Sequence, residues 1–160
     1  MHDNIFDRIL STTKMSDDTP IKFKTKKGLI MIKNRKHAHI GLGTNDIDKT
    51  TDWYIDELGF ELYGQCVAPD GTPCRFIRNG DVRYEIFQPV SGIKPEHVGK
   101  IDHFAFVSDD IEKDYEFCKS KGYTFTTDGI QEIPTAWEKG TKYFKVASAT
   151  GEEIEFAQIL

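Results

Sequence analysis

The chain lacks the features that mark several large classes of protein. No apolar run in its 160 residues approaches the roughly 18 residues that span a membrane. Its amino terminus, Met1-His2-Asp3-Asn4, lacks the basic-then-apolar order of a signal peptide. No block of Lys and Arg offsets the net charge of -5, which argues against a nucleic-acid partner. We therefore expect a soluble cytoplasmic protein that binds neither membrane nor nucleic acid.

Cysteine is also scarce, and the three thiols do not have the spacing of a metal-binding motif. Cys66, Cys74 and Cys118 are odd in number, so we interpret them as reduced thiols rather than a disulfide framework. Hydrophobic residues make up 38% of the chain and aromatic residues 12%. This content is enough for one domain, or for two small modules that share one core.

Two phrases of the sequence occur twice. The longer phrase covers residues 39–48 (HIGLGTNDID) and again residues 103–112 (HFAFVSDDIE). In each copy a histidine opens an apolar-rich strand, and an Asp-Ile-acid triplet follows at the same distance. The shorter phrase covers residues 85–88 (EIFQ) and again residues 155–158 (EFAQ). These matches indicate two copies of one supersecondary unit.

Helix caps, turn signals and apolar periodicity predict the same order of elements in both copies. Asp46 and Asp110 are expected to begin a helix, and Gly59 to end the first one. Asn79-Gly80 is a strong hairpin signal. The strands expected in the first copy cover residues 36–43, 60–67, 72–78 and 82–88. Those expected in the second cover residues 101–107, 123–127, 142–147 and 153–159.

The repeat also divides the chain. We expect an N-terminal extension over residues 1–33, a first βαβββ module over 34–90, a linker over 91–100 and a second βαβββ module over 101–160. The loop over residues 129–141, which contains Trp137, has no counterpart in the first module. It is equally consistent with a lid and with a surface loop.

The repeat places two histidines and two glutamates at equivalent positions. His39 aligns with His103, and Glu85 aligns with Glu155. A carboxylate with apolar neighbours on a strand is expensive to bury unless it is paired or bound to a metal. These four residues are therefore the candidate metal site. His37 would share a strand face with His39, but it aligns with Ile101 and is excluded from the set.

These features are similar to those of the vicinal oxygen chelate superfamily, which includes lactoylglutathione lyases (glyoxalases) and methylmalonyl-CoA epimerases. The resemblance covers residues 36–160. It implies an α+β fold, with two tandem βαβββ modules forming a mixed-sheet cup around a metal site. The residues that carry it are His39 to Asp46, Trp53-Tyr54, Leu58-Gly59-Phe60, Tyr84 to Gln88 and Gly151 to Gln158.

The resemblance also implies a chemistry for the site. His39, Glu85, His103 and Glu155 would hold one divalent metal ion, and Zn, Ni, Co, Mn and Fe all suit this donor set. Two positions would stay open for two oxygens of one substrate. Glu155 or Glu85 would be the catalytic base, and the likeness to glyoxalases favours Glu155.

The expected function is that of a metal-dependent lyase or isomerase of the glyoxalase type, acting on a small-molecule substrate as a homodimer. The alternatives are an acyl-CoA epimerase of the methylmalonyl-CoA type and a non-catalytic drug-binding resistance protein. Whether the cup forms within one chain or from exchanged modules stays open. Four basic residues on the predicted strands are candidates for an anionic substrate, or are solvated: Arg75, Arg78, Arg83 and Lys142.

Overall fold

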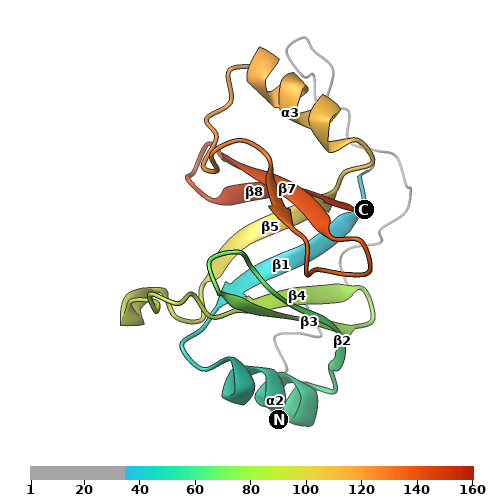
Figure 1. The fold of residues 1–160 in the computed structure, drawn as a ribbon. Coiled ribbons are helices and arrows are strands. Elements are labelled where there is room, and N and C mark those ends of the chain that lie inside the picture. Colours follow the sequence, from blue (N-terminus) through green and yellow to red (C-terminus); the bar gives the residue numbers. More distant parts are fainter. Residues whose placement is uncertain (1–34) are drawn as a thin grey trace, which may run out of the picture.

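The computed structural model describes residues 35–160 (Figure 1). The N-terminal extension predicted over residues 1–33 lies outside this part. The first module contains β1 (His37–Gly43), α2 (Ile47–Leu58), β2 (Glu61–Val67), β3 (Pro73–Asn79) and β4 (Val82–Phe87). The second contains β5 (Ile101–Val107), α3 (Ile111–Ser120), β6 (Gln131–Ile133), β7 (Thr141–Ala147) and β8 (Glu153–Ile159). A short 3-10 helix, η1 (Pro95–His97), lies between them.

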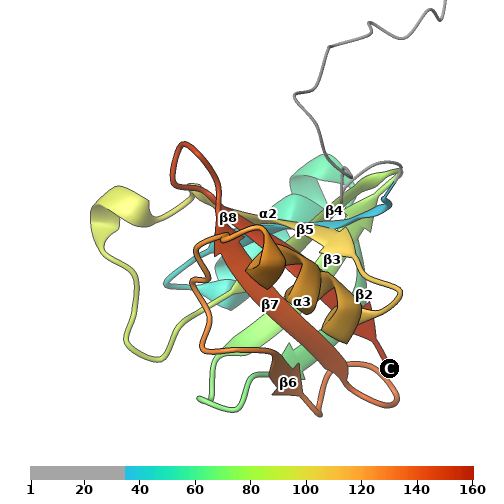
Figure 2. The same ribbon diagram turned by 90° about the horizontal axis from the view of Figure 1, so that it is seen from above.

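All eight strands form one mixed sheet, in the order β2-β3-β4-β1-β5-β8-β7-β6. The first strands of the two modules, β1 and β5, pair antiparallel at the centre. On either side β4 runs parallel to β1, and β8 runs parallel to β5. The sheet curls into a half-barrel, and the two helices cover its opposite ends (Figures 1 and 2). The predicted α+β fold is confirmed, and one chain supplies every strand of the cup.

Each helix is tied to its module by the same contacts. The side chain of Asp46 accepts a hydrogen bond from the backbone N–H of Lys49 at 3.0 Å, as predicted for a helix cap. In the second module Asp110 accepts from the N–H of Lys113, also at 3.0 Å. Gly59 ends the first helix with a φ of 66°, the left-handed conformation that glycine adopts without strain.

The glutamine of the repeated short phrase provides a second cap. The Gln88 side-chain oxygen accepts from the backbone N–H of Ile47 at 2.9 Å, and that of Gln158 accepts from Ile111 at 2.8 Å. This glutamine stands three positions after the glutamate of the same phrase. Because strand side chains alternate between faces, this odd spacing sends the glutamate to one face and the glutamine to the other.

Three groups of buried side chains form the core. One lies between α2 and the sheet, and its members are Ile47, Phe60, Ile77 and Ile86. One lies between α3 and the sheet, and its members are Ile111, Cys118, Phe144, Val146 and Phe156. The third joins the two modules, and its members are Cys66, Cys74, Phe76, Ile133 and Ala136. None of the described helices is long and apolar enough to cross a membrane.

The predicted strand over residues 123–127 is wrong. This segment makes a single bridge to β7, between Phe125 and Val146, and the strand that pairs with β7 is β6. Gly129, with a φ of 71°, breaks the extended chain between the two stretches. The edge strand therefore lies within the segment that was predicted to be a loop.

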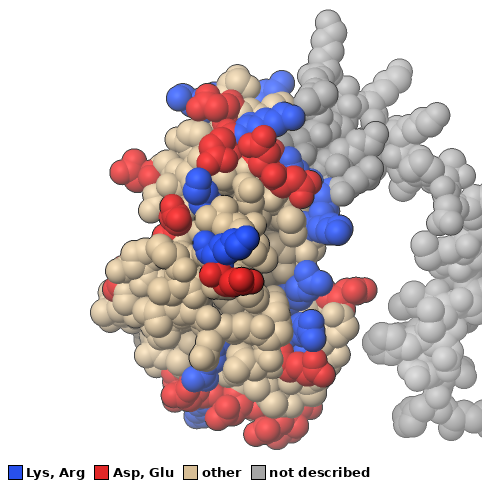
Figure 3. Space-filling view, turned by 45° about the vertical axis from the view of Figure 1, so that its right-hand side comes forward, with Lys and Arg blue, Asp and Glu red and all other residues tan. Residues whose placement is uncertain are grey.

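Two of the four basic candidates do not face the cup. Arg75 of β3 pairs with Asp48 in the first turn of α2, and Lys142 of β7 pairs with Glu112 in the first turn of α3 at 2.9 Å. Both lie on the helix side of the sheet, so of the two alternatives the role toward a substrate is excluded. Acidic and basic side chains are mixed over the face of the molecule shown in Figure 3.

A buried ion pair closes one end of the second module. Arg35 donates to both carboxylate oxygens of Asp114 on α3, at 2.5 Å each, and the Ser108 hydroxyl donates to the same carboxylate at 2.6 Å. The Asp114 side chain is only 8% exposed. Removing one partner of such a pair leaves the other charge without its neutralising contact.

We expect Asp114→Ala to lower the free energy of unfolding by roughly 2 kcal/mol, since a half-buried guanidinium loses its carboxylate and the Ser108 hydroxyl loses its acceptor. Urea unfolding followed by circular dichroism measures this change. Asp109→Ala, at an exposed position nearby, is the matched control and should change stability by less than about 0.5 kcal/mol. Equal effects of the two substitutions would contradict a stabilising role of the pair.

Candidate metal centre

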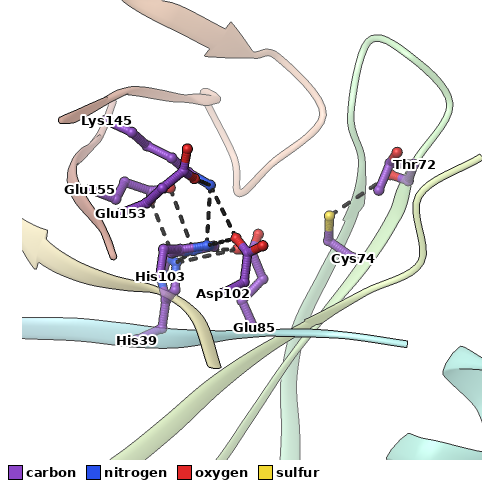
Figure 4. Close-up of polar contacts among 9 residues, drawn as sticks. All are labelled: His39, Thr72, Cys74, Glu85, Asp102, His103, Lys145, Glu153 and Glu155. Carbon is purple, nitrogen blue, oxygen red and sulfur yellow. Dashed lines mark hydrogen bonds and ion pairs between the residues drawn. The ribbon is translucent and has the colours of Figure 1, made fainter. Parts of the chain in front are cut away.

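Four adjacent strands at the centre of the sheet each supply one side chain of the candidate site. In the order of the sheet these are Glu85 on β4, His39 on β1, His103 on β5 and Glu155 on β8. All four residues are buried. Figure 4 shows the two imidazoles together, with the carboxylates approaching them from either side.

The four side chains are in contact. The Nε2 atoms of His39 and His103 are 3.1 Å apart. The Oε2 atom of Glu85 lies 3.3 Å from the His39 Nε2 and 3.2 Å from the His103 Nε2. Glu155 reaches the same two nitrogens with its two oxygens, at 3.5 and 3.6 Å. Each imidazole therefore contacts a glutamate from both modules. The ligand atoms that all lie close to one another are those of His39, His103 and Glu155, and Glu85 contacts the two imidazoles from the other side (Figure 4).

The pairing of β1 with β5 requires a small residue beside the imidazoles. Gly41 is the register partner of His103, and a Cβ atom built on Gly41 would lie 2.1 Å from the His103 ring. Ala105 is the register partner of His39. Sequence reasoning missed Gly41. The signal available was that small residues follow both histidines at the same distance, two positions later.

The spacing of the donor atoms fits a divalent metal ion. Donors held about 2.1 Å from an ion lie roughly 3.0 to 3.4 Å from one another in octahedral or tetrahedral arrangements. The separations between the imidazole nitrogens and their partners, 3.1 to 3.6 Å, lie close to this range. One ligand atom each from His39, His103 and Glu155 lies within 4.8 Å of the other two. Two imidazoles with carboxylates suit Zn and the neighbouring transition metals.

Burial and neighbouring charges shift the pKa values of His103 and Glu85 in opposite directions. Burial alone lowers the pKa of His103. Hydrogen bonds to Asp102 and Glu85, together with the charge of Glu155, outweigh burial and raise this pKa to about 9. Burial raises the pKa of Glu85, but the charge of His39 and the hydrogen bonds to both imidazoles bring it well below its usual value. Without an ion, a second proton on the His103 imidazole therefore offsets part of the carboxylate charge.

The site lies in a cavity of about 840 Å³ that both modules line. Arg78 and Arg83, which are register partners on β3 and β4, both line it. His37 is not among its lining residues. A β-bulge between His37 and His39 shifts the register there, which removes the shared face expected from simple alternation.

Trp137 forms part of the cavity wall. Its ring stacks on Tyr63 at 5.7 Å between centroids and lies 5.1 Å from the ring of Phe76. The indole also covers Gly64, where an added Cβ would lie 2.7 Å from the ring. In the same segment the Thr135 hydroxyl donates to the carbonyl of Val67 on the edge strand β2, at 2.6 Å. The segment that follows β6 thus connects the two outer edges of the sheet.

Comparisons with known proteins agree with this architecture. A family model described as the glyoxalase/bleomycin resistance protein/dioxygenase superfamily matches residues 36–156. The uncharacterized protein YwbC of Bacillus subtilis (strain 168) is 27% identical over 124 residues, which cover 75% of this chain and 94% of that protein.

Solved structures show the same fold. The hypothetical protein BH1468 from Bacillus halodurans C-125 superposes with a TM-score of 0.65 at 24% identity, over 79% of this chain and 96% of that chain. Methylmalonyl-CoA epimerase from Mycobacterium tuberculosis superposes with a TM-score of 0.66 at 17% identity, over 78% of this chain and 88% of that chain. At these identities the likeness establishes the fold.

We expect Gly41→Ala to abolish tight binding of Zn²⁺ or Ni²⁺, because the methyl group would displace the His103 ring from the site. Metal content after dialysis, measured by plasma emission spectrometry, tests this. Gly43→Ala is the control, since the atom it meets is the flexible end of Ile93. Full metal content in Gly41→Ala would show that His103 is not held where the structure places it.

The metal-free protein should lose stability as the pH rises from about 6.5 to 9. The folded-state pKa of His103 lies above its usual value of 6.5, so its contribution is complete below 6.5 and is lost as the pH passes 9. The fall should be up to about 3 kcal/mol. Urea unfolding with a chelator present measures it, and His103→Asn should flatten the dependence. An unchanged slope in that variant would contradict the assignment.

Proposed function

Because the chain belongs to the glyoxalase/bleomycin resistance protein/dioxygenase superfamily, we propose that it is a metal-dependent lyase or isomerase of the glyoxalase type. It would act on a small molecule with adjacent oxygens and move a proton at the carbon next to a carbonyl. The observation that carries the proposal is the contact of two buried imidazoles with two buried carboxylates in a cavity.

The residues of the chain have distinct roles in this proposal. His39, His103, Glu85 and Glu155 hold the divalent ion, and the cavity above them holds the substrate. A divalent ion supplies charge stabilisation for oxygens that become negative when a proton leaves the neighbouring carbon. Glu155 takes that proton and returns it. Its carboxylate lies 3.5 to 3.6 Å from the imidazoles, and Glu155 lines the cavity that would hold the substrate.

The cavity wall suggests what else the substrate carries. Arg78 and Arg83 lie directly opposite each other on neighbouring strands and both line the cavity. Arg78 pairs with Glu61 at 3.5 Å and lies over the Tyr63 ring, whereas Arg83 has no ion pair with a carboxylate of the described residues. Arg83 is therefore the cation that an anionic group of the substrate would meet. Trp137 and Tyr63 add an aromatic surface to the same cavity. A substrate with an anionic group and an apolar part matches this lining.

An acyl-CoA epimerase of the methylmalonyl-CoA type is the second candidate. The observation that favours it is that Glu85 and Glu155 flank the imidazole pair from the two outer strands of the four. Inverting a carbon centre requires that a proton leaves one face and returns to the other, and two carboxylates on opposite sides provide for both steps. A binding protein that sequesters a drug without turnover is the third candidate. The complete donor set counts against it.

One chain supplies all four donors, so the proposed site does not need a second copy. The homodimer expected from the family resemblance stays a prediction, and sedimentation equilibrium of the full chain tests it. The cytoplasmic location also stays a prediction.

The experiment that separates these functions starts with the purified protein loaded with Zn²⁺, Ni²⁺, Co²⁺, Mn²⁺ or Fe²⁺. Each form is tested with 2-oxoaldehyde–thiol adducts and with acyl-CoA esters in deuterated water. Deuterium at the carbon next to the carbonyl is expected in one of the two panels, and the panel identifies the reaction. Stoichiometric binding of a drug without any exchange would favour sequestration.

We expect Glu155→Gln to retain most of the metal and to lose about 10²- to 10⁴-fold in kcat, because an amide can bind a metal but cannot accept the proton. Glu85→Gln is the matched variant at the equivalent position of the repeat. A larger loss of kcat there, with metal retained, would make Glu85 the base. Similar losses in both would favour the epimerase, which uses two carboxylates.

A further inference from the structure

The two halves of the candidate metal site are not equivalent. Alignment of the repeat pairs each side chain of the first module with one of the second, and at three positions beside the site the chemistry differs. The second module has Asp102, Lys145 and Glu153 where the first has Ala38, Phe76 and Arg83. All six of these residues line the cavity.

The three charged residues form one connected group behind His103 (Figure 4). Asp102 Oδ1 lies 2.8 Å from the Nδ1 atom of His103. Lys145 Nζ lies 3.6 Å from the same oxygen of Asp102 and 3.1 Å from the His103 Nδ1. Lys145 also donates to Glu153 Oε2 at 3.0 Å. The three side chains differ in exposure, from 15% for Lys145 to 44% for Asp102.

The contact between Asp102 and His103 bears on which nitrogen of the imidazole carries a proton. Two neighbours make opposite demands on the Nδ1 of His103: an ionised Asp102 at 2.8 Å accepts a proton from it, whereas the Lys145 ammonium at 3.1 Å could only donate to it. The contact with Asp102 is the shorter one, and Lys145 already donates to Glu153 at 3.0 Å. We therefore assign the proton to Nδ1, where it is donated to Asp102. The other nitrogen, Nε2, then faces His39, Glu85 and Glu155. In metal sites, a carboxylate that accepts the hydrogen bond of the non-ligating nitrogen orients the histidine ring and raises the basicity of the nitrogen that binds the metal.

His39 is held by different means. At the position equivalent to Asp102 stands Ala38, which has no acceptor. At the position equivalent to Lys145 stands Phe76, whose ring contacts the His39 ring edge-on at 5.7 Å between centroids. The His103 ring also packs on an aromatic ring, that of Phe87, at 6.1 Å between centroids. Among the described residues, the imidazoles therefore differ in that a carboxylate contacts the Nδ1 of His103 and none contacts that of His39.

We propose that Asp102 is a positioning residue for His103, and that Lys145, anchored by Glu153, keeps the Asp102 carboxylate in place. This inference rests on the proposed metal site and adds to it an orienting group outside the four ligands. Lys145 balances the carboxylates of Asp102 and Glu153 and prevents Asp102 from turning into solvent. The charged group thereby determines which nitrogen of His103 is available to the ion.

Metal affinity of the full chain tests the proposal, measured by competition with a chromophoric chelator for Zn²⁺. Asp102→Ala should weaken Zn²⁺ binding about 10- to 100-fold. Asp102→Asn should retain most of the affinity, since its amide oxygen still accepts from Nδ1. Lys145→Met should weaken binding in the wild-type background but have no further effect in Asp102→Ala. Glu132→Gln, which removes a carboxylate elsewhere on the cavity rim, is the control and should bind as the wild type does.

Nitrogen-15 NMR of the histidine rings gives a readout that does not depend on activity. In the Zn²⁺-loaded protein, the proton of His103 should reside on Nδ1, with a downfield shift that is lost in Asp102→Ala. If the wild type binds no divalent ion, the proposed metal site itself fails. If the wild type binds Zn²⁺ but Asp102→Ala binds equally well and keeps the Nδ1 signal, only the positioning role is overturned.

Discussion

The antiparallel pairing of β1 with β5 is the contact on which the rest of this structure depends. It joins the two modules into one sheet, and its register brings His39 and His103 to within 3.1 Å of each other. A slip by one residue would turn either histidine to the opposite face. Because both imidazoles come from this central pair, the site forms only when the modules are joined. The same contact thus provides both the fold and the candidate chemistry.

The neighbouring strands β4 and β8 couple the site to the helices. Each carries a glutamate that faces the imidazoles and, three residues later, a glutamine that caps the helix behind the sheet. A shift of either strand would withdraw both contacts together. Each strand thus has two contacts to preserve, one through its glutamate and one through its glutamine. This accounts for the presence of both residues, at the same spacing, in both modules. It also means that the position of the carboxylates depends on helix packing.

Much of this arrangement could be predicted from the sequence, because the repeat shows which residues occupy equivalent positions in the two modules. It identified His39, Glu85, His103 and Glu155 as a set, and the structure brings their side chains together. What it could not report is which residues face each other between modules. The need for a small residue at Gly41, and the contacts of Lys145, depend on pairings between strands far apart in the sequence. The sequence also left open which face of the sheet Arg75 and Lys142 occupy, because no neighbouring residue on those strands fixed the direction of the alternation.

Departures from the repeat carry information of their own. A duplicated module begins with two equivalent halves, and burial tends to keep apolar residues at lining positions such as Phe76. Replacing that aromatic side chain by Lys145 places a charge beside the site, which is unfavourable unless acids surround it. Asp102 and Glu153 are those acids, and the charge of Lys145 is balanced only when they are present. The first half has Ala38 and Phe76 at the positions of Asp102 and Lys145, and Arg83 at that of Glu153, so the two sides of the cavity differ chemically.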